Sequence, residues 1–120
     1  MIQHVTLEAR EQDAPAEASF WALLGFTLVE APVALAGRSL WVERSGTQVH
    51  VMYAERPEIP ASAHVAVVAS DYDEAIARLC AAGHAVEPRA AHWGAARAYT
   101  RSPAGHRVEV MAAAPPAARG

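Results

Sequence analysis

The chain has 120 residues, of which 52% are hydrophobic and 19% charged, so it is long enough for one folded domain and too hydrophobic for a disordered tail. Its formal net charge is −3 and its basic residues are scattered, which excludes a basic stripe for nucleic acid. With no hydrophobic run of about 18 residues and no signal region in residues 1–4, we expect a cytoplasmic protein that does not enter a membrane.

The first half of the chain predicts one helix and four strands in the order β-α-β-β-β. Alternating residues predict a strand over residues 1–8, and a helix is predicted from Asp13 to just before Gly25. The apolar face of this helix comprises Ala16, Phe20, Leu23 and Leu24. Three further strands are predicted over residues 26–30, 39–44 and 47–53.

The second half repeats this order after a short linker that contains Pro57 and Pro60. A strand is predicted over residues 63–69, and a helix capped by Ser70 or Asp71 follows it. The apolar face of this helix is predicted to comprise Tyr72, Ile76, Leu79 and Cys80. Three more strands are predicted over residues 85–88, 95–101 and 106–111, the last two joined by a turn at residues 102–105.

The two halves therefore correspond to two copies of one structural unit. His4 corresponds to His64 at an offset of 60 residues. A four-stranded sheet with one helix covers only one of its faces, so two such units are expected to pack together. We predict an α+β fold with two βαβββ modules packed to form a cleft between curved sheets. The predicted single domain spans residues 1–114, with module one at 1–57, module two at 61–113 and a flexible tail at 115–120.

The repeat also brings four possible metal ligands into equivalent positions. His50 corresponds to Glu109 at an offset of 59 residues, just as His4 corresponds to His64. Strand alternation separates His50 from Val49 and Val51, which predicts that His50 faces the cleft. The same alternation applies around Glu109. Each residue alone is best explained as a hydrogen-bonded core or rim residue, but the shared pattern favours a common site.

Three imidazoles and one carboxylate are ligands that suit Zn²⁺, Ni²⁺, Co²⁺, Mn²⁺ or Fe²⁺ better than Mg²⁺ or Ca²⁺. Other chemistry is excluded by composition. All ten basic residues are arginines, so a lysine Schiff base and a phosphate-loop lysine are absent. The single cysteine, Cys80, forms no internal disulfide and is expected to pack within the protein rather than to act as a nucleophile.

These residues resemble the vicinal oxygen chelate superfamily, which includes glyoxalase I, extradiol dioxygenases, fosfomycin thiol transferases and bleomycin resistance proteins. The resemblance covers nearly the whole chain. Its motifs are His4-Val5-Thr6-Leu7, Phe20-Trp21-x-x-Leu24-Gly25-Phe26, His64-Val65-Ala66 and Ser102-Pro103-Ala104-Gly105-His106-Arg107-Val108-Glu109. The resemblance implies metal ligands at His4, His64 and Glu109, with His50 as a variable fourth ligand, and it implies a homodimer.

By this resemblance, the leading hypothesis is a metal-dependent glyoxalase-like lyase or isomerase. Its small-molecule substrate would present two neighbouring oxygens and pass through an enediolate-type intermediate, with Glu109 or a metal-bound water moving the proton. The alternatives are an Fe²⁺ dioxygenase of the extradiol type, a fosfomycin-type thiol transferase and a metal-free protein that binds an antibiotic. His50 argues against the dioxygenase because it fills a position that oxygen chemistry leaves open.

Six further residues are candidates for substrate binding: Thr6, Trp41, Trp93, Arg97, Tyr99 and Arg107. Trp41 is predicted to lie either on the cleft or at an exposed sheet edge. Trp93 is a candidate lid, with packing of its own loop as the alternative. Tyr99, together with Arg97 or Arg107, is predicted to orient an anionic substrate, the alternative being that these arginines are simply solvated.

Overall fold

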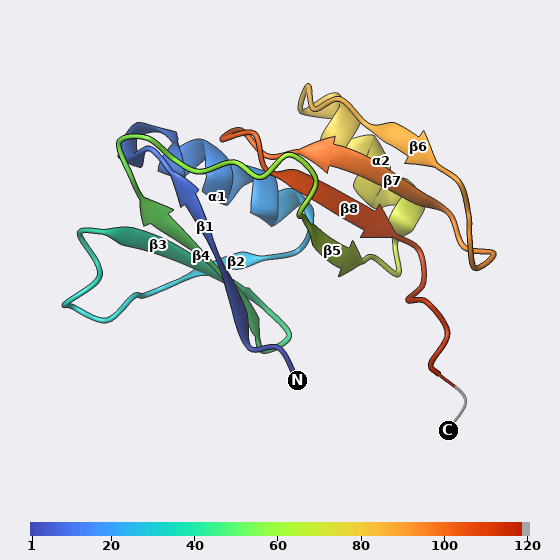
Figure 1. The fold of residues 1–120 in the computed structure, drawn as a ribbon, viewed down its shortest axis with the longest axis horizontal. Helices are drawn as coiled ribbons and strands as arrows, with labels where there is room; N and C mark the ends of the chain where they lie inside the picture. Colours follow the sequence, from blue (N-terminus) through green and yellow to red (C-terminus); the bar gives the residue numbers. More distant parts are fainter. Residues whose placement is uncertain (119–120) are drawn as a thin grey trace.

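The structure is a computed structural model that describes residues 1–118, and it contains two four-stranded sheets with one α-helix each (Figure 1). The first unit begins with β1, followed by a 3₁₀ turn and a helix, and ends with a hairpin. Its elements are β1 (His4–Ala9), η1 (Glu11–Asp13), α1 (Ala14–Leu23), β2 (Thr27–Val29), β3 (Ser39–Arg44) and β4 (Thr47–Tyr53).

The second unit repeats this arrangement without the 3₁₀ turn. Its elements are β5 (Val65–Val68), α2 (Tyr72–Ala81), β6 (Glu87–Arg89), β7 (Arg97–Arg101) and β8 (Arg107–Met111). The strand orders are β1-β4-β3-β2 and β5-β8-β7-β6, so the topologies match. In each sheet the first strand pairs parallel with the last, and the other pairs are antiparallel. The predicted α+β fold with two βαβββ modules is confirmed.

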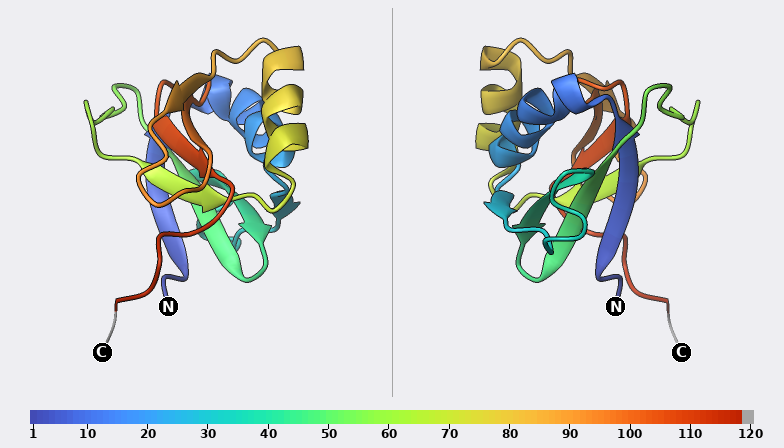
Figure 2. Two further views of the ribbon diagram at one scale, coloured as in Figure 1. Left: turned by 90° about the vertical axis from the view of Figure 1, so that its right-hand side faces the viewer. Right: turned by 90° about the vertical axis from the view of Figure 1, so that its left-hand side faces the viewer.

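Each helix covers the inner face of its own sheet, and α1 also contacts α2 (Figure 2). Alternate strand residues such as Val49, Val51, Val108 and Val110 point into this layer and are almost fully buried. The intervening residues lie on the opposite face of each sheet, which no helix covers. We call these the open faces, and they carry the predicted site residues.

The two sheets lie side by side and are not closed around a cleft within the chain (Figure 1). Between the edge strands β1 and β5 there is a cavity of about 540 Å³, lined by side chains that include Ile2, Val5, His64 and Val68. Neither helix in residues 1–118 is long and apolar enough to cross a membrane. The last two residues of the predicted tail lie outside the described residues.

Both helices differ from the predicted apolar faces. In α1, Ala16 is exposed, whereas Glu17 and Trp21 are buried. In α2, Cys80 is exposed and Ala75 takes its predicted place in the core. The prediction followed the spacing of apolar residues along each helix. In α1 the buried stripe instead includes Glu17, whose carboxylate is held by Trp21 and by Ala104 of the other unit.

Three side chains, those of Glu17, His106 and Arg78, form hydrogen bonds that join the modules. The Glu17 carboxylate accepts hydrogen bonds from Trp21 Nε1 at 3.0 Å and from the backbone N–H of Ala104 at 2.8 Å. Ala104 lies in the β7–β8 turn of the second unit. His106, which is also buried, has its Nε2 2.7 Å from the carbonyl oxygen of Glu8 in β1. Arg78 Nε donates to the carbonyl oxygen of Leu23 at 3.1 Å. These contacts fix the second unit against the first.

Candidate functional site

The open face of the first sheet carries three stacked rings. Trp41 on β3 lies directly opposite His50 on β4, and their ring centroids are 3.7 Å apart. His4 on β1 covers the other side of the His50 ring at 4.2 Å. Since both faces of its ring are covered, His50 is only 8% exposed, whereas His4 is exposed. We call His4 and His50 the first half-site.

Hydrogen bonds orient both imidazoles of the first half-site. His4 Nδ1 lies 2.6 Å from Gln3 Oε1, and His50 Nε2 lies 2.7 Å from Gln48 Oε1. Gln48 is itself held by Glu43, since its Nε2 donates to Glu43 Oε1 at 2.9 Å. The other nitrogen of each ring has no hydrogen-bond partner among residues 1–118. Burial, and then the nearby His4, hold the pKa of His50 below its ordinary value of 6.5.

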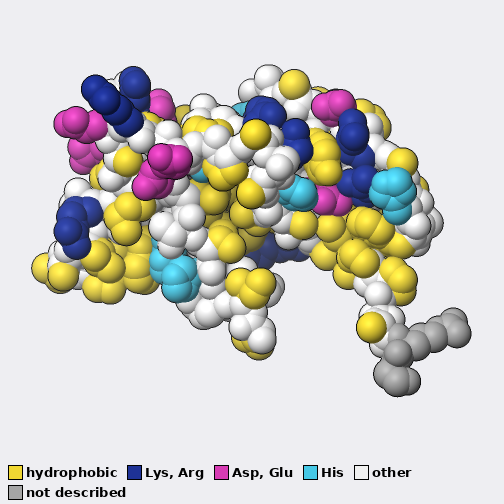
Figure 3. Space-filling view, viewed as in Figure 1, with side chains coloured by type: hydrophobic (Ala, Val, Ile, Leu, Met, Phe, Trp, Pro, Cys, Tyr) yellow, Lys and Arg dark blue, Asp and Glu magenta, His cyan; other side chains and the backbone are white. Residues whose placement is uncertain are grey.

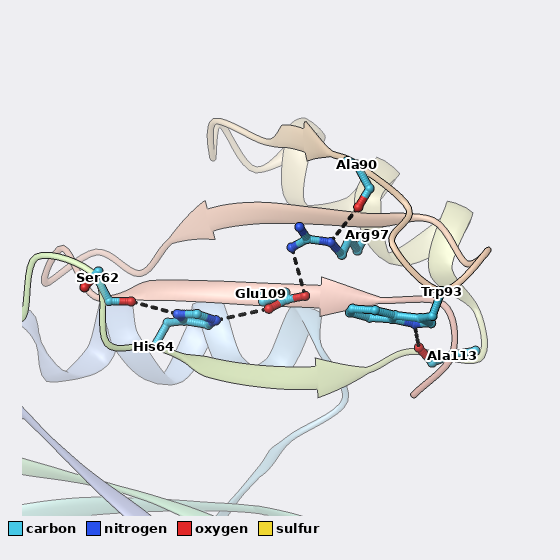
Figure 4. A network of polar contacts seen from close by, with 7 residues as sticks. All are labelled: Ser62, His64, Ala90, Trp93, Arg97, Glu109 and Ala113. Carbon is cyan, nitrogen blue, oxygen red and sulfur yellow. Dashed lines mark hydrogen bonds and ion pairs between the residues drawn. The ribbon is translucent and has the colours of Figure 1, made fainter. Parts of the chain in front are cut away.

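The open face of the second sheet brings His64 and Glu109 together (Figure 4). His64 Nε2 lies 3.0 Å from Glu109 Oε1, while His64 Nδ1 lies 2.8 Å from the carbonyl oxygen of Ser62. The Ser62 oxygen can only accept, so Nδ1 carries its proton. This leaves Nε2 directed at the carboxylate. We call His64 and Glu109 the second half-site.

Arg97 binds the other oxygen of Glu109. Its Nη1 donates to Glu109 Oε2 at 3.2 Å, and its Nε donates to the carbonyl oxygen of Ala90 at 2.7 Å. Both members of this ion pair have side chains only 8% exposed. Tyr99 makes the largest contribution to raising the pKa of Arg97, and Glu109 raises it further. Arg97 is therefore buried and paired with a carboxylate, and the alternative prediction that it is solvated is wrong.

The predicted ligands therefore meet in two pairs within one chain. His4 meets His50, and His64 meets Glu109. Within residues 1–118 no group of three or more histidine, cysteine, aspartate or glutamate side chains is arranged to hold a metal ion. Completing a four-ligand set requires a first half-site to approach a second half-site.

The remaining candidates occupy different positions around these pairs. Thr6 is exposed and lies opposite His50 on the neighbouring strand. Trp93 Nε1 donates to the carbonyl oxygen of Ala113 at 2.9 Å, so its loop is packed against the chain beyond β8. Tyr99 lies 5.4 Å from His64 between ring centroids, and the Arg107 guanidinium lies over the Tyr99 ring at 4.9 Å.

Sequence reasoning missed two groups on the open faces. Strand alternation puts Gln48 on the same face as His50, but its role in linking Glu43 to the imidazole was not predicted. Strand alternation also puts Arg101 on the same face as Tyr99. It lies directly opposite Arg107 but was not predicted to be a binding residue. The signal for both was the alternation of the strands.

The sequence model of the glyoxalase-like domain family matches residues 4–111. A structure of a glyoxalase family protein from Bacillus anthracis superposes with a TM-score of 0.83 at 25% identity, covering 92% of this chain and 93% of the other. A lactoylglutathione lyase from Agrobacterium tumefaciens gives 0.70 at 24% identity, covering 92% of each chain.

A third structure, the oxidase ChaP-H2, gives a TM-score of 0.74 at 22% identity, covering 95% of this chain and 94% of the other. The lyase and the oxidase show a shared fold and not a shared activity. No curated protein sequence matches the chain. With a family match over nearly its full length, the chain belongs to the glyoxalase-like domain family of the vicinal oxygen chelate superfamily.

Proposed function

We propose that the protein is a divalent-metal-dependent lyase or isomerase that acts on a small substrate with two neighbouring oxygens. The observation that carries this proposal is the geometry of the second half-site. His64, which directly precedes β5, and Glu109 on β8 are 45 positions apart in the sequence, yet Nε2 and Oε1 lie 3.0 Å apart. The bond from His64 Nδ1 to the Ser62 carbonyl is the support that metal-binding imidazoles normally have.

The donor chemistry of all four residues fits a transition metal. Each imidazole has one nitrogen held by an oxygen acceptor from Gln3, Gln48 or Ser62. The other nitrogen of His4 and of His50 is free of hydrogen bonds within residues 1–118, and that of His64 faces Glu109. Imidazoles oriented in this way, with one carboxylate, are suited to Zn²⁺, Ni²⁺, Co²⁺, Mn²⁺ or Fe²⁺.

A bound divalent ion would supply Lewis-acid stabilisation of negative charge on the two substrate oxygens. The chain supplies the proton transfer. Glu109 is the candidate base and acid because it is a buried carboxylate beside the open face. Arg97 holds Oε2 and leaves Oε1 as the oxygen directed toward His64. Trp41 stacks on the His50 ring, and together the two side chains shield the metal site from water.

We further propose that a homodimer completes the site, with the first half-site of one protomer facing the second half-site of its partner. Both half-sites lie on open faces that the helices leave uncovered. Several hydrophobic side chains are also exposed, including Ile2 at 71% and Val68 at 41%. A partner that covers these surfaces would remove apolar area from water.

Elemental analysis of protein purified without added metal tests the proposal. We expect about one transition-metal ion per chain, and Glu109→Gln should retain at most about a tenth of it because the charged ligand is lost. The matched control is Glu87→Gln, which removes an exposed carboxylate from the same sheet. Equal metal content in both variants would refute the role of Glu109. Iron alone would favour the dioxygenase over the isomerase.

One observation favours a second function, a metal-free binding protein. Arg97 already neutralises the Glu109 carboxylate within the chain. On the first sheet, the Trp41 ring stacks on His50 and offers an aromatic surface. A flat ligand could stack there without a metal. Metal-free protein that binds no transition metal at micromolar concentration would support this function and exclude the lyase or isomerase.

A further inference from the structure

The open face of the second sheet concentrates positive charge in a chain whose net charge is negative. Four of the ten arginines lie on β6, β7 and β8, namely Arg89, Arg97, Arg101 and Arg107. In Figure 3 basic side chains gather over this sheet, with acidic and histidine side chains between them. Two of these arginines are neutralised, Arg89 by Glu87 at 3.1 Å and Arg97 by Glu109 at 3.2 Å.

The other two arginines form a like-charge pair. Arg101 and Arg107 are direct partners in the register of β7 and β8, and both side chains are on the open face. Like charges directly opposite each other destabilise a sheet. Arg101 donates to the carbonyl oxygen of Gly105 at 2.9 Å, which leaves its charge unbalanced. Arg107 has no ion pair or hydrogen bond with any residue in 1–118.

The contact with Tyr99 leaves the N–H groups of Arg107 available to a ligand. The Arg107 guanidinium carbon lies over the Tyr99 ring, 4.9 Å from the ring centroid, which is a cation–π contact. Because the Arg107 side chain makes no hydrogen bond within residues 1–118, its N–H groups remain free to donate in pairs. A hollow of about 180 Å³ is lined by side chains that include Arg101, Arg107, Tyr99 and Glu87.

We propose that this hollow binds the carboxylate of a small molecule between Arg101 and Arg107. The two guanidinium forks match the geometry of a carboxylate, and a bound anion removes the repulsion between them. A volume of about 180 Å³ corresponds to only about six water molecules, so it holds a head group and not a whole large ligand. The Glu87 carboxylate is paired with Arg89 but also lines the hollow, where it repels a doubly charged phosphate more strongly than a singly charged carboxylate.

The hollow lies on the same face as the second half-site, because Tyr99 pairs with Glu109 across β7 and β8. A substrate anchored in the hollow by a carboxylate would extend toward Glu109. The inference that this carboxylate belongs to the substrate rests on the proposed function. The binding of a carboxylate in the hollow is independent of that function, because it needs no metal.

The test therefore uses the full chain after removal of metal with a chelator. Benzoate and its neutral counterpart benzamide are titrated, and binding is followed by broadening of their proton NMR signals. We expect benzoate to bind and benzamide not to bind at the same concentrations. Arg107→Met and Arg101→Met should each weaken benzoate binding by about tenfold, the loss expected for one charge-assisted bidentate contact. Arg38→Met, at an exposed position in the first unit, is the matched control and should leave binding unchanged.

Three results would overturn the proposal: equal binding of benzamide, binding that is unchanged in both arginine variants, or inorganic phosphate binding more tightly than benzoate. Arg107→Lys guards against a folding defect, because it keeps the charge and removes the fork. It should bind benzoate more weakly than the wild type and more tightly than Arg107→Met. If benzoate did not bind but the protein as purified held its metal, the proposed function would stand and the carboxylate site would be refuted. If benzoate bound but the protein as purified held no metal, the carboxylate site would stand and the proposed function would be refuted.

Discussion

Replacing Glu17 tests how the two modules are joined. Its side chain is 1% exposed, and its two oxygens accept from Trp21 Nε1 and from the backbone N–H of Ala104. A hydrogen bond to a charged group contributes about 1.5 to 3 kcal/mol, and a buried donor left without a partner costs about 1 to 3 kcal/mol. Glu17→Gln keeps the side-chain volume and one accepting oxygen, so we expect a loss of about 2 kcal/mol in the free energy of unfolding.

Glu17→Ala should cost more, about 4 kcal/mol, because both donors lose their partner and a cavity forms. Urea unfolding measures both values, and thermal unfolding of a chain this size should show about 4 °C of Tm loss per kcal/mol. Glu30→Gln, at an exposed position without contacts of this kind, should stay within about 0.5 kcal/mol of the wild type. If Glu17→Gln and Glu30→Gln were equally stable, the charge of the Glu17 carboxylate would contribute no net stability through its two hydrogen bonds, and the reasoning would be refuted.

Two further predictions concern the site and the chain beyond it. In metal-free protein, NMR titration should show His50 taking up its proton below pH 6.5, and His4→Gln should move that pKa upward because a neighbouring charge is removed. As the pH falls, the unfolded chain takes up this proton at a higher pH than the folded protein does. The contribution of His50 to stability is therefore present above pH 6.5 and is lost as the pH falls through its folded pKa. A folded-state pKa of His50 above 6.5 would contradict this. Trp93→Phe removes the donor to the Ala113 carbonyl, and we expect faster amide hydrogen exchange at residues 112–114 with a stability loss of about 1 kcal/mol. Exchange unchanged at those residues would show that this bond does not hold the segment.

Much of this fold follows from local patterns that the sequence carries twice. The alternation around His50 and Glu109 predicts which face they occupy, because successive strand residues point to opposite sides of a sheet. The glycine at position 25, with φ of +88°, ends α1 as predicted, since it adopts a left-handed conformation that other residues avoid. The order of strands in each sheet then brings His64 beside Glu109.

What the sequence could not predict depends on contacts between distant segments. Glu17 is buried because Ala104, which lies 87 positions away, donates to it, and no local pattern reports that contact. Arg97 was read as a candidate with solvation as the alternative, because an isolated arginine on a strand carries no sign that a buried carboxylate faces it. The placement of the two sheets side by side, and hence the separation of the ligands into pairs, depends on how the helices pack.

The separation into half-sites leads to a prediction that distinguishes a site within a chain from one shared between protomers. His50→Gln damages the first half-site, and Glu109→Gln damages the second. If protomers exchange half-sites, a mixed dimer of the two variants contains one site with both defects and one site with none. Random pairing of equal amounts makes about half of the dimers mixed, so unfolding and refolding the mixture should restore about a quarter of the wild-type metal content. Each variant refolded alone should stay empty of metal. If the mixture also stayed empty while dimers formed, the four ligands would not be shared across a dimer, and the proposed metal site would be wrong.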